Sequence, residues 1–238
     1  MNRSFRYFLY KVRQYKDRGA KYSQIKHFFR WRKFLLPGAN SVRDEQAWIT
    51  FEAIDLINQF MRDGQEIFEF GGGGSSLFFT KKNIRLYTVE HDQSWFESLQ
   101  KIMSEKKRSN WTGHFVPVEK GNLVDVPDAS IPEHYSSNDE NSKGHHYRSY
   151  ASAIDQYPDH FFDLILVDGR ARVSCLEHSI NKLKTGGLLV LDNSDRSYYR
   201  DHFEKEHLPK FECLLDRYGP SPYTNDFTKT SIWRKKHE

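Results

Sequence analysis

A run of four glycines with an acidic neighbour is the stretch of this sequence best suited to bind a ligand. Gly71–Gly74 follow the apolar segment 66–70, and Glu69 stands two residues before the first glycine. Glycine lets the backbone turn tightly and approach a bound group, as the turns of nucleotide-binding domains require. A carboxylate at this position would repel an anionic pyrophosphate and attract a cation. The pattern therefore predicts a nucleotide-like ligand that carries a positive charge.

A second acid, Glu90, closes the next apolar segment, 85–89. It follows Glu69 by one predicted helix and one predicted strand. At this spacing a carboxylate can accept hydrogen bonds from both hydroxyls of a ribose. We therefore expect the cofactor to be bound by the glycine turn and the two acids: Glu69, Gly71, Gly73, Gly74 and Glu90.

Further polar residues follow two later apolar segments. Asp168 comes after the fourth segment, and Asp192 and Asn193 come after the fifth. Because the carboxyl ends of parallel strands share one edge of a sheet, these side chains should converge near the ligand. Their oxygens are of the kind that Mg²⁺ binds, so Asp168, Asp192 and Asn193 are candidate metal ligands. Without a metal, Asp168, Asp192 or His91 is the candidate base for a hydroxyl acceptor.

Two arginines stand beside the first of these acids. Arg170 and Arg172 follow Asp168 in the stretch Asp168-Gly169-Arg170-Ala171-Arg172. A guanidinium binds carboxylate or phosphate in two-point fashion, so these residues are candidates for an anionic group of the substrate.

Apolar runs that alternate with helical patterns position these residues. The expected strands are 66–70, 85–89, 113–118, 162–167, 188–191, 211–215 and 228–233. Helices are expected between them, and the polar segment 119–146 is expected to be a long loop. A further helix carries Trp48 to Phe60, with Ser41 or Asp44 as its cap. The fold class is α/β: a doubly wound, mostly parallel Rossmann-like sheet with a C-terminal antiparallel strand pair and an N-terminal helical extension.

With these motifs the chain resembles the class I S-adenosylmethionine-dependent methyltransferases over about residues 46–236. The first motif of that family matches Glu69 with Gly71 and Gly73, although serine stands at Ser75 where the family often has glycine. The acid of its second motif matches Glu90. The resemblance implies S-adenosylmethionine as cofactor and methyl transfer as the reaction.

Asp168, Asp192 and Asn193 also resemble the magnesium ligands of the metal-dependent O-methyltransferases, such as catechol O-methyltransferase. That subgroup has a lysine base three residues after its first aspartate, whereas this chain has Ala171. The partial resemblance implies Mg²⁺ as a second cofactor, which would lower the pKa of a substrate hydroxyl.

The function that these features favour is O-methylation of a small-molecule or saccharide hydroxyl by in-line displacement. Three alternatives stay open: aminopropyl transfer from decarboxylated S-adenosylmethionine, an NAD(P)-dependent Rossmann enzyme, and a non-catalytic nucleotide-binding module. Glu69 and the terminal strand pair disfavour the NAD(P) enzyme.

Charge is distributed unevenly along the 238 residues. The net charge is +4, but residues 1–36 hold eleven Lys and Arg against one acid, which leaves −6 for the remainder. We expect residues 1–45 to be a basic, aromatic-rich helical extension and residues 46–238 to be the methyltransferase domain. The extension is interpreted as a helix pair that covers the domain, or as a contact with an anionic membrane surface through Phe5, Phe8 and Val12. Nucleic-acid contact is the least favoured interpretation.

The remaining composition is typical of a soluble protein. The two cysteines, Cys175 and Cys213, predict no disulfide framework. No apolar run is long enough for a transmembrane helix, and the basic first residues lack the apolar core of a signal peptide. The expected location is the cytoplasm, with peripheral membrane contact through residues 1–36 as an option.

Overall fold

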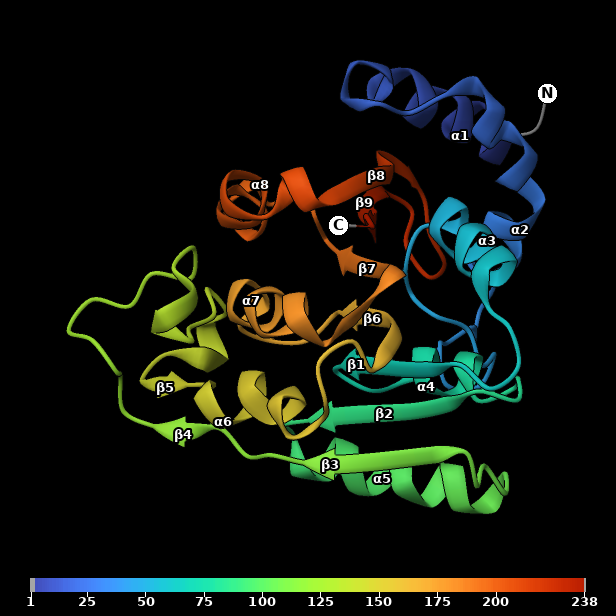
Figure 1. Ribbon diagram of the computed structural model, residues 1–238. Coiled ribbons are helices and arrows are strands. Elements are labelled where there is room, and N and C mark those ends of the chain that lie inside the picture. Colours follow the sequence, from blue (N-terminus) through green and yellow to red (C-terminus); the bar gives the residue numbers. More distant parts are fainter. Residues whose placement is uncertain (1–2, 238) are drawn as a thin grey trace.

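Seven strands form one twisted sheet in the computed structural model, which describes residues 3–237 (Figure 1). The strand order is β3-β2-β1-β6-β7-β9-β8. The first five strands of that order are parallel, and β9 runs antiparallel between β7 and β8. The strands are β1 (Glu66–Phe70), β2 (Arg85–Glu90), β3 (Trp111–Phe115), β6 (Phe162–Val167), β7 (Leu183–Asp192), β8 (Phe211–Pro220) and β9 (Phe227–Lys235). The predicted fold class is confirmed.

Helices cover both faces of this sheet. The α-helices are α1 (Arg3–Gln14), α2 (Phe28–Lys33), α3 (Phe51–Phe60), α4 (Gly74–Phe79), α5 (Gln93–Glu105), α6 (Arg148–Ala151), α7 (Arg172–Lys182) and α8 (Asp201–Glu206). Short 3₁₀ turns join several of them, including η2 (Tyr22–His27) before α2 and η5 (Ser152–Gln156) after α6. A separate two-stranded antiparallel sheet, hereafter the β4–β5 hairpin, is formed by β4 (Glu119–Lys120) and β5 (His145–His146), which the long segment 121–144 connects.

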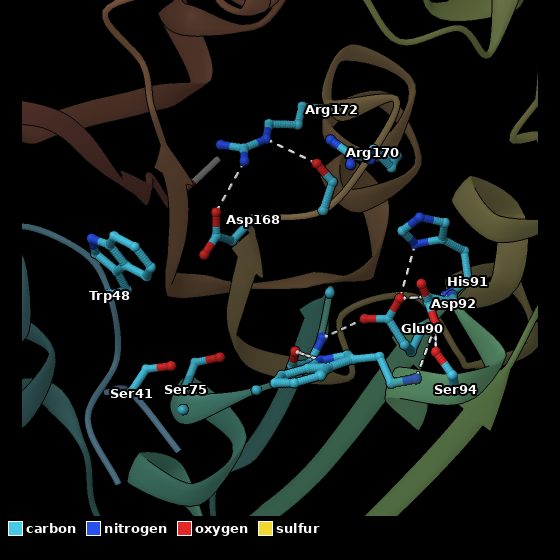
Figure 2. A pocket seen from close by; sticks show the side chains of 16 residues that line it. Ser41, Trp48, Ser75, Glu90, His91, Asp92, Ser94, Asp168, Arg170 and Arg172 are labelled. Carbon is cyan, nitrogen blue, oxygen red and sulfur yellow. Dashed lines mark hydrogen bonds and ion pairs between the residues drawn. The ribbon is translucent and has the colours of Figure 1, made fainter. Parts of the chain in front are cut away.

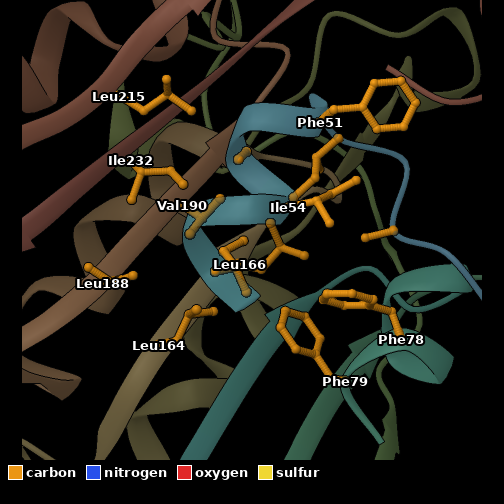
Figure 3. Packing of buried hydrophobic residues seen from close by; sticks show 14 of the residues in the cluster. Phe51, Ile54, Phe78, Phe79, Leu164, Leu166, Leu188, Val190, Leu215 and Ile232 are labelled. Carbon is orange, nitrogen blue, oxygen red and sulfur yellow. The ribbon is translucent and has the colours of Figure 1, made fainter. Parts of the chain in front are cut away.

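Alternation along the central strands builds a core on each face of the sheet. Leu164 and Leu166 of β6 point toward α3 and α4, whereas Ile165 and Val167 point toward α6 and α7. Figure 3 shows the first of these cores, where side chains of α3 and α4 meet those of β6, β7, β8 and β9. Because both faces are covered, these strands consist of continuous apolar runs.

The basic N-terminal segment packs into the first core. Phe8 and Val12 of α1 are 0% and 1% exposed, and the Phe8 ring lies 5.4 Å from that of Phe227 in β9. Tyr15 stacks on Tyr218 of β8 at 4.7 Å. The expectation that Phe8 and Val12 insert into a membrane is wrong for this arrangement, because the fold itself buries them. None of the helices within residues 3–237 has the length and apolar character needed to cross a bilayer.

Other departures from the sequence-based expectations are local. Thr50 precedes the first turn of α3, so Ser41 and Asp44 do not cap that helix, and Trp48 lies outside it. Residues 119–146 contain the β4–β5 hairpin and two 3₁₀ turns instead of an unstructured loop. Strand β7 extends back through Gly186 and Gly187, where its pairing with β6 becomes irregular.

Candidate active site

The carboxyl ends of β1, β2 and β6 open onto one cavity of about 510 Å³ (Figure 2). A volume of this size holds a ligand as large as a nucleoside derivative. The lining residues are Ser41, Trp48, Gly71, Gly72, Gly73, Gly74, Ser75, Glu90, His91, Asp92, Ser94, Trp95, Asp168, Gly169, Arg170 and Arg172. The cavity therefore contains the glycine turn, Glu90, His91, Asp168 and both predicted arginines. Glu69, Asp192 and Asn193 are not among the residues that line it.

The glycine turn forms the floor of the cavity between β1 and α4. Gly71 has a φ of +87°, and a Cβ there would lie 3.0 Å from Gly169 Cα, so a side chain would disturb both strand ends. The N–H groups of the first three glycines already have acceptors in the protein. Gly71 donates to Val89 O at 2.9 Å, Gly72 to Glu90 Oε2 at 3.1 Å, and Gly73 to Ser76 Oγ at 2.9 Å.

Glu69 is completely buried beneath the turn. Its Oε1 accepts hydrogen bonds from Ser76 Oγ and from Thr88 Oγ1, the latter at 2.7 Å. Its Oε2 finds no partner among residues 3–237. Burial raises the pKa of Glu69 to about 7, although the hydroxyl donors oppose the rise. Through Ser76, which accepts from Gly73 N–H, this carboxyl fixes the shape of the turn.

Glu90 closes β2 and faces the cavity. Besides Gly72 N–H, its carboxylate accepts from the backbone N–H of His91 at 2.7 Å and of Asp92 at 3.0 Å. The ring of His91 places Nδ1 2.9 Å from Glu90 Oε1. Burial by itself would raise the pKa of Glu90, but the His91 ring and these backbone donors outweigh it and lower the pKa. Glu90 is thus held as an anion at the cavity wall.

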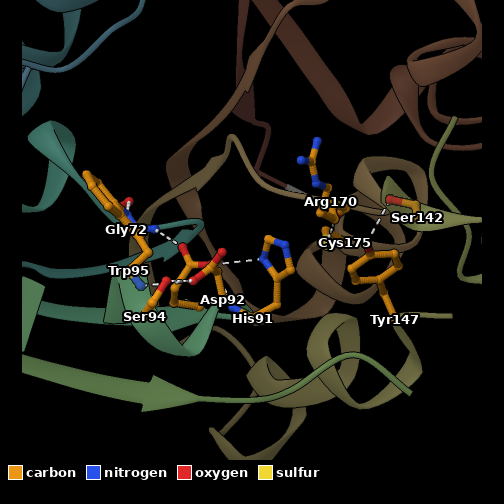
Figure 4. Close-up of polar contacts among 10 residues, drawn as sticks. Gly72, His91, Asp92, Ser94, Trp95, Ser142, Tyr147, Arg170 and Cys175 are labelled. Atoms are coloured by element: carbon orange, nitrogen blue, oxygen red, sulfur yellow. Dashed lines mark hydrogen bonds and ion pairs between the residues drawn. The ribbon is translucent and has the colours of Figure 1, made fainter. Parts of the chain in front are cut away.

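Two side chains at the start of α5 complete this wall and were missed in the sequence (Figure 4). Asp92 caps the helix by accepting from Trp95 N–H at 2.9 Å. Trp95 then donates its indole Nε1–H to Gly72 O at 2.8 Å, so its ring lies against the glycine turn. An aspartate directly before the first turn of a helix is a recognisable N-cap signal. The ring's contact with the turn has no such signal.

On the opposite wall, Arg172 contacts the carboxylate of Asp168 and the backbone carbonyl of Asp192. Its Nη2 lies 3.0 Å from Asp168 Oδ1, its Nε donates to Gly169 O at 3.0 Å, and its Nη1 donates to Asp192 O. The guanidinium also lies over the ring of Tyr199 at 5.3 Å. Its side chain is only 9% exposed. Arg172 is therefore committed to internal contacts.

The carboxyl groups of Asp168 and Asp192 both have perturbed pKa values. Burial raises the pKa of Asp168, and the charge of Arg172 opposes that rise. Burial and the charge of Asp168 raise the pKa of Asp192 to about 8, although Arg172 opposes this too. Asp192 Oδ1 accepts from Thr230 Oγ1 at 2.7 Å and so points into the protein. Asp168, whose side chain is 26% exposed, is the acid of this pair that faces the cavity.

This arrangement does not fit the Mg²⁺ ion that the partial resemblance implied. The Asp168 carboxylate already has a cationic partner in Arg172, whose guanidinium also donates to the backbone carbonyl of Asp192. The Asp192 carboxylate is turned toward Thr230, and Asn193 lies outside the cavity lining at a φ of +49°. The oxygens of Asp168, Asp192 and Asn193 therefore do not form a convergent set for a metal.

Arg170 is the more available of the two arginines. Its side chain is 34% exposed and reaches Asp139 of the 119–146 segment at 3.0 Å. The same segment is held to the domain by Ser142, which hydrogen-bonds Tyr147 at 2.7 Å (Figure 4). Arg170 O in turn accepts from the buried thiol of Cys175 at 3.3 Å. The 119–146 segment therefore contacts the cavity wall through Arg170, although none of its own residues lines the cavity.

No protein-family model and no curated protein sequence matches this chain. Solved structures do match. TrmN from Thermus thermophilus is 12% identical with a TM-score of 0.50, over 77% of this chain and 48% of that one. An rRNA methylase from Streptococcus thermophilus is 12% identical with a TM-score of 0.51, over 78% and 95%.

A third similar structure is SMU.1697c from Streptococcus mutans, solved in complex with S-adenosylhomocysteine (SAH). It is 9% identical with a TM-score of 0.52, over 77% of this chain and 96% of that one. This chain spans slightly less than half the length of TrmN. At these identities the likeness concerns the fold. With its strand order, its single antiparallel strand and its glycine turn after β1, this chain has the Rossmann-like fold of the class I S-adenosylmethionine-dependent methyltransferases.

Proposed function

We propose that the cavity binds S-adenosylmethionine and that the protein is a methyltransferase. The observation that carries this proposal is that the N–H groups of the glycine turn already have acceptors within the protein. Gly71, Gly72 and Gly73 all donate their N–H groups within the protein, so these groups are not free for a pyrophosphate. A dinucleotide cofactor depends on such donors, whereas S-adenosylmethionine has no phosphate.

The charges of the cavity support the same choice. Glu90, Asp92 and Asp168 line it, while Arg170 and Arg172 are each paired with an aspartate. The lining thus holds three carboxylates against two guanidiniums, a balance of charge that favours a cationic ligand. Bound S-adenosylmethionine would supply a methyl group already activated by its sulfonium charge.

Individual residues then take distinct roles toward the cofactor. Glu90 is the ribose partner, since its carboxylate is ionised and lies at the end of β2. The exposed rings of Trp48 and Trp95 flank the ligand, and Gly71, Gly73 and Gly74 form the wall beside it. Glu69 is a positioning residue, because it acts on the turn through Ser76 and does not itself line the cavity.

For the acceptor we propose a hydroxyl group of a small molecule or saccharide. Asp168 is the residue placed to take its proton, because it faces the cavity and its raised pKa makes it a stronger base than an ordinary carboxylate. Arg172 holds Asp168 in position. Arg170 lies at the rim and is paired with Asp139. An anionic group of the acceptor would take the place of Asp139 in this ion pair.

Calorimetric titration with SAH, methylthioadenosine and NAD tests the cofactor proposal. We expect SAH to bind and NAD not to bind. Glu90→Gln should weaken SAH binding by about 1–3 kcal/mol, because a charge-assisted hydrogen-bond pair is lost. Glu97→Gln, an exposed change on the adjoining helix, should leave the affinity unchanged. Folded protein that binds NAD but not SAH would overturn the proposal.

A second candidate acceptor is RNA, favoured by the outward face of α1. Arg3, Arg6, Tyr7, Tyr10 and Arg13 are exposed and recur along one side of that helix. Arginines contact phosphates and tyrosines stack on bases, and the Streptococcus thermophilus structure is of an rRNA methylase. Salt-dependent binding of the whole protein to RNA, lost in Arg6→Glu/Arg13→Glu, would support this candidate. Binding only to anionic vesicles would instead support the membrane contact.

A further inference from the structure

A second group of chemically reactive side chains lies at the junction of α7 and α8, away from the cavity. Glu177 belongs to α7, His202 to α8, and His207 follows the last residue of α8. One donor atom from each lies within 4.8 Å of the other two. None of the three lines the proposed active site. Within residues 3–237, this is the one such grouping of histidine, cysteine and carboxylate side chains.

The donor atoms converge on a single carboxylate oxygen. His202 Nε2 lies 3.1 Å from Glu177 Oε2, and His207 Nε2 lies 2.8 Å from the same atom. In a tetrahedral zinc site with bonds near 2.1 Å, neighbouring donors are roughly 3.4 Å apart. Each histidine nitrogen therefore needs to move away from Glu177 Oε2 by only a few tenths of an ångström to admit an ion, and the two histidine nitrogens lie within 4.8 Å of each other. Small side-chain rotations accomplish such a change.

The site has a rigid base and an open side. Phe203, between the two histidines in sequence, is 1% exposed, and its ring packs against His207 at 6.1 Å and Trp233 at 4.7 Å. The Glu177 and His202 side chains are 40% and 30% exposed, which leaves access for an ion and for a water as fourth ligand. Three protein ligands with one open position are the usual composition of an accessible zinc site.

We propose that Glu177, His202 and His207 bind a Zn²⁺ ion. Two imidazole nitrogens and one carboxylate oxygen suit this borderline metal better than Mg²⁺, which prefers oxygen ligands and six-fold coordination. The ion would tie α8 to α7, the helix that begins at Arg172 and so at the wall of the cavity. This inference is independent of the identity of the cofactor.

Titration of chelator-treated full-length protein with ZnCl₂, against a chromophoric chelator, tests the proposal. We expect one Zn²⁺ per chain, no comparable effect of MgCl₂, and a rise in Tm of about 5 °C or more at saturating Zn²⁺. His202→Ala and His207→Ala should each weaken binding at least about tenfold. Glu177→Gln, which keeps the side-chain shape, gives the same test if an alanine variant fails to fold.

His178→Ala is the matched control. His178 lies next to Glu177 on α7 but points to Asp155, 2.8 Å away, so its loss should leave Zn²⁺ affinity unchanged. The proposal is overturned if the wild-type protein binds no stoichiometric Zn²⁺, or if His178→Ala weakens binding as much as His207→Ala does. It is also overturned if Glu177→Gln retains full affinity.

Discussion

At the scale of single residues, the buried carboxyl of Glu69 makes the stability of the protein depend on pH. Its pKa in the folded protein is about 7, above its value of 4.5 in an unfolded chain. A raised pKa means that the stability this group contributes is fully present below about pH 4.5 and is lost as pH rises through 7. A difference of this size corresponds to about 3 kcal/mol. The ionised Glu69 carboxylate beneath the glycine turn therefore lowers the free energy of unfolding above about pH 7.

Glu69→Gln should remove this pH dependence. Relative to the wild type, the variant should gain about 3 kcal/mol in free energy of unfolding between pH 4.5 and pH 8, because the amide does not ionise. Urea unfolding at several pH values measures the change. Glu97→Gln, on the exposed face of α5, serves as control. A constant difference between Glu69→Gln and wild type across this range would contradict the raised pKa.

The sequence allowed the positions of most site residues to be predicted, but not the contacts that their side chains make. The glycine turn, Glu90 and Asp168 lie at the cavity as expected, because strand ends follow directly from the apolar pattern. It did not predict that Glu69 faces inward, because a strand residue next to a turn can point to either side. Arg172 was expected to face a substrate. Its bond to the carbonyl of Asp192, twenty residues away, depends on tertiary packing.

At the scale of elements, the loop that joins β6 to α7 presses closely on α6. A Cβ on Gly169 would lie 1.9 Å from Tyr150 Oη and 3.1 Å from Tyr150 Cζ. Tyr150 is 0% exposed, and its hydroxyl finds no hydrogen-bond partner in the described part of the chain. The hydroxyl is thus the group that forbids a side chain at Gly169.

Gly169→Ala should destabilise the protein by about 1–3 kcal/mol, as overpacking does. Tyr150→Phe alone should be near neutral, since it removes an unpaired buried hydroxyl. The double variant should recover part of the loss, and chemical unfolding of all four proteins yields the coupling energy. Tyr147→Phe, whose hydroxyl bonds Ser142 instead, should show additive behaviour with Gly169→Ala. Additivity in the Tyr150 cycle would show that the contact is absent.

The elements themselves were largely predictable. Strands β1 and β6 have the predicted bounds, since each is a short apolar run followed by glycine or aspartate-glycine. Strand β7 was predicted too short, because Gly186 and Gly187 normally indicate a turn but here lie within the strand. The β4–β5 hairpin was missed because two-residue strands carry no periodic signal.

At the scale of the whole molecule, residues 3–34 and the rest of the chain share one core. Phe8, Trp31 and Phe227 pack together, and Trp31 Nε1 donates to Thr224 O at 3.0 Å. Phe8→Ala should therefore lower the free energy of unfolding by about 3–5 kcal/mol in one cooperative transition. Denaturant unfolding followed by both circular dichroism and tryptophan fluorescence measures it.

Tyr10→Ala, an exposed change on the same helix, should have little effect in that experiment. If Phe8→Ala leaves the main transition unchanged and produces a separate early one, the helices of residues 3–34 form an independent unit instead.

This shared core also constrains how the chain is synthesised. The Tyr15 hydroxyl donates a hydrogen bond to Asp226, which lies 211 residues further along the chain. Asp226 is therefore synthesised well after Tyr15. At about 5–20 residues per second, the delay is roughly 10–40 s. During that interval the central strands β1, β2 and β6 can already pair, while Phe8, Val12 and Trp31 still lack the β8–β9 surface that covers them. These apolar side chains of the nascent N-terminal segment therefore reach their final burial only after β9 has been made.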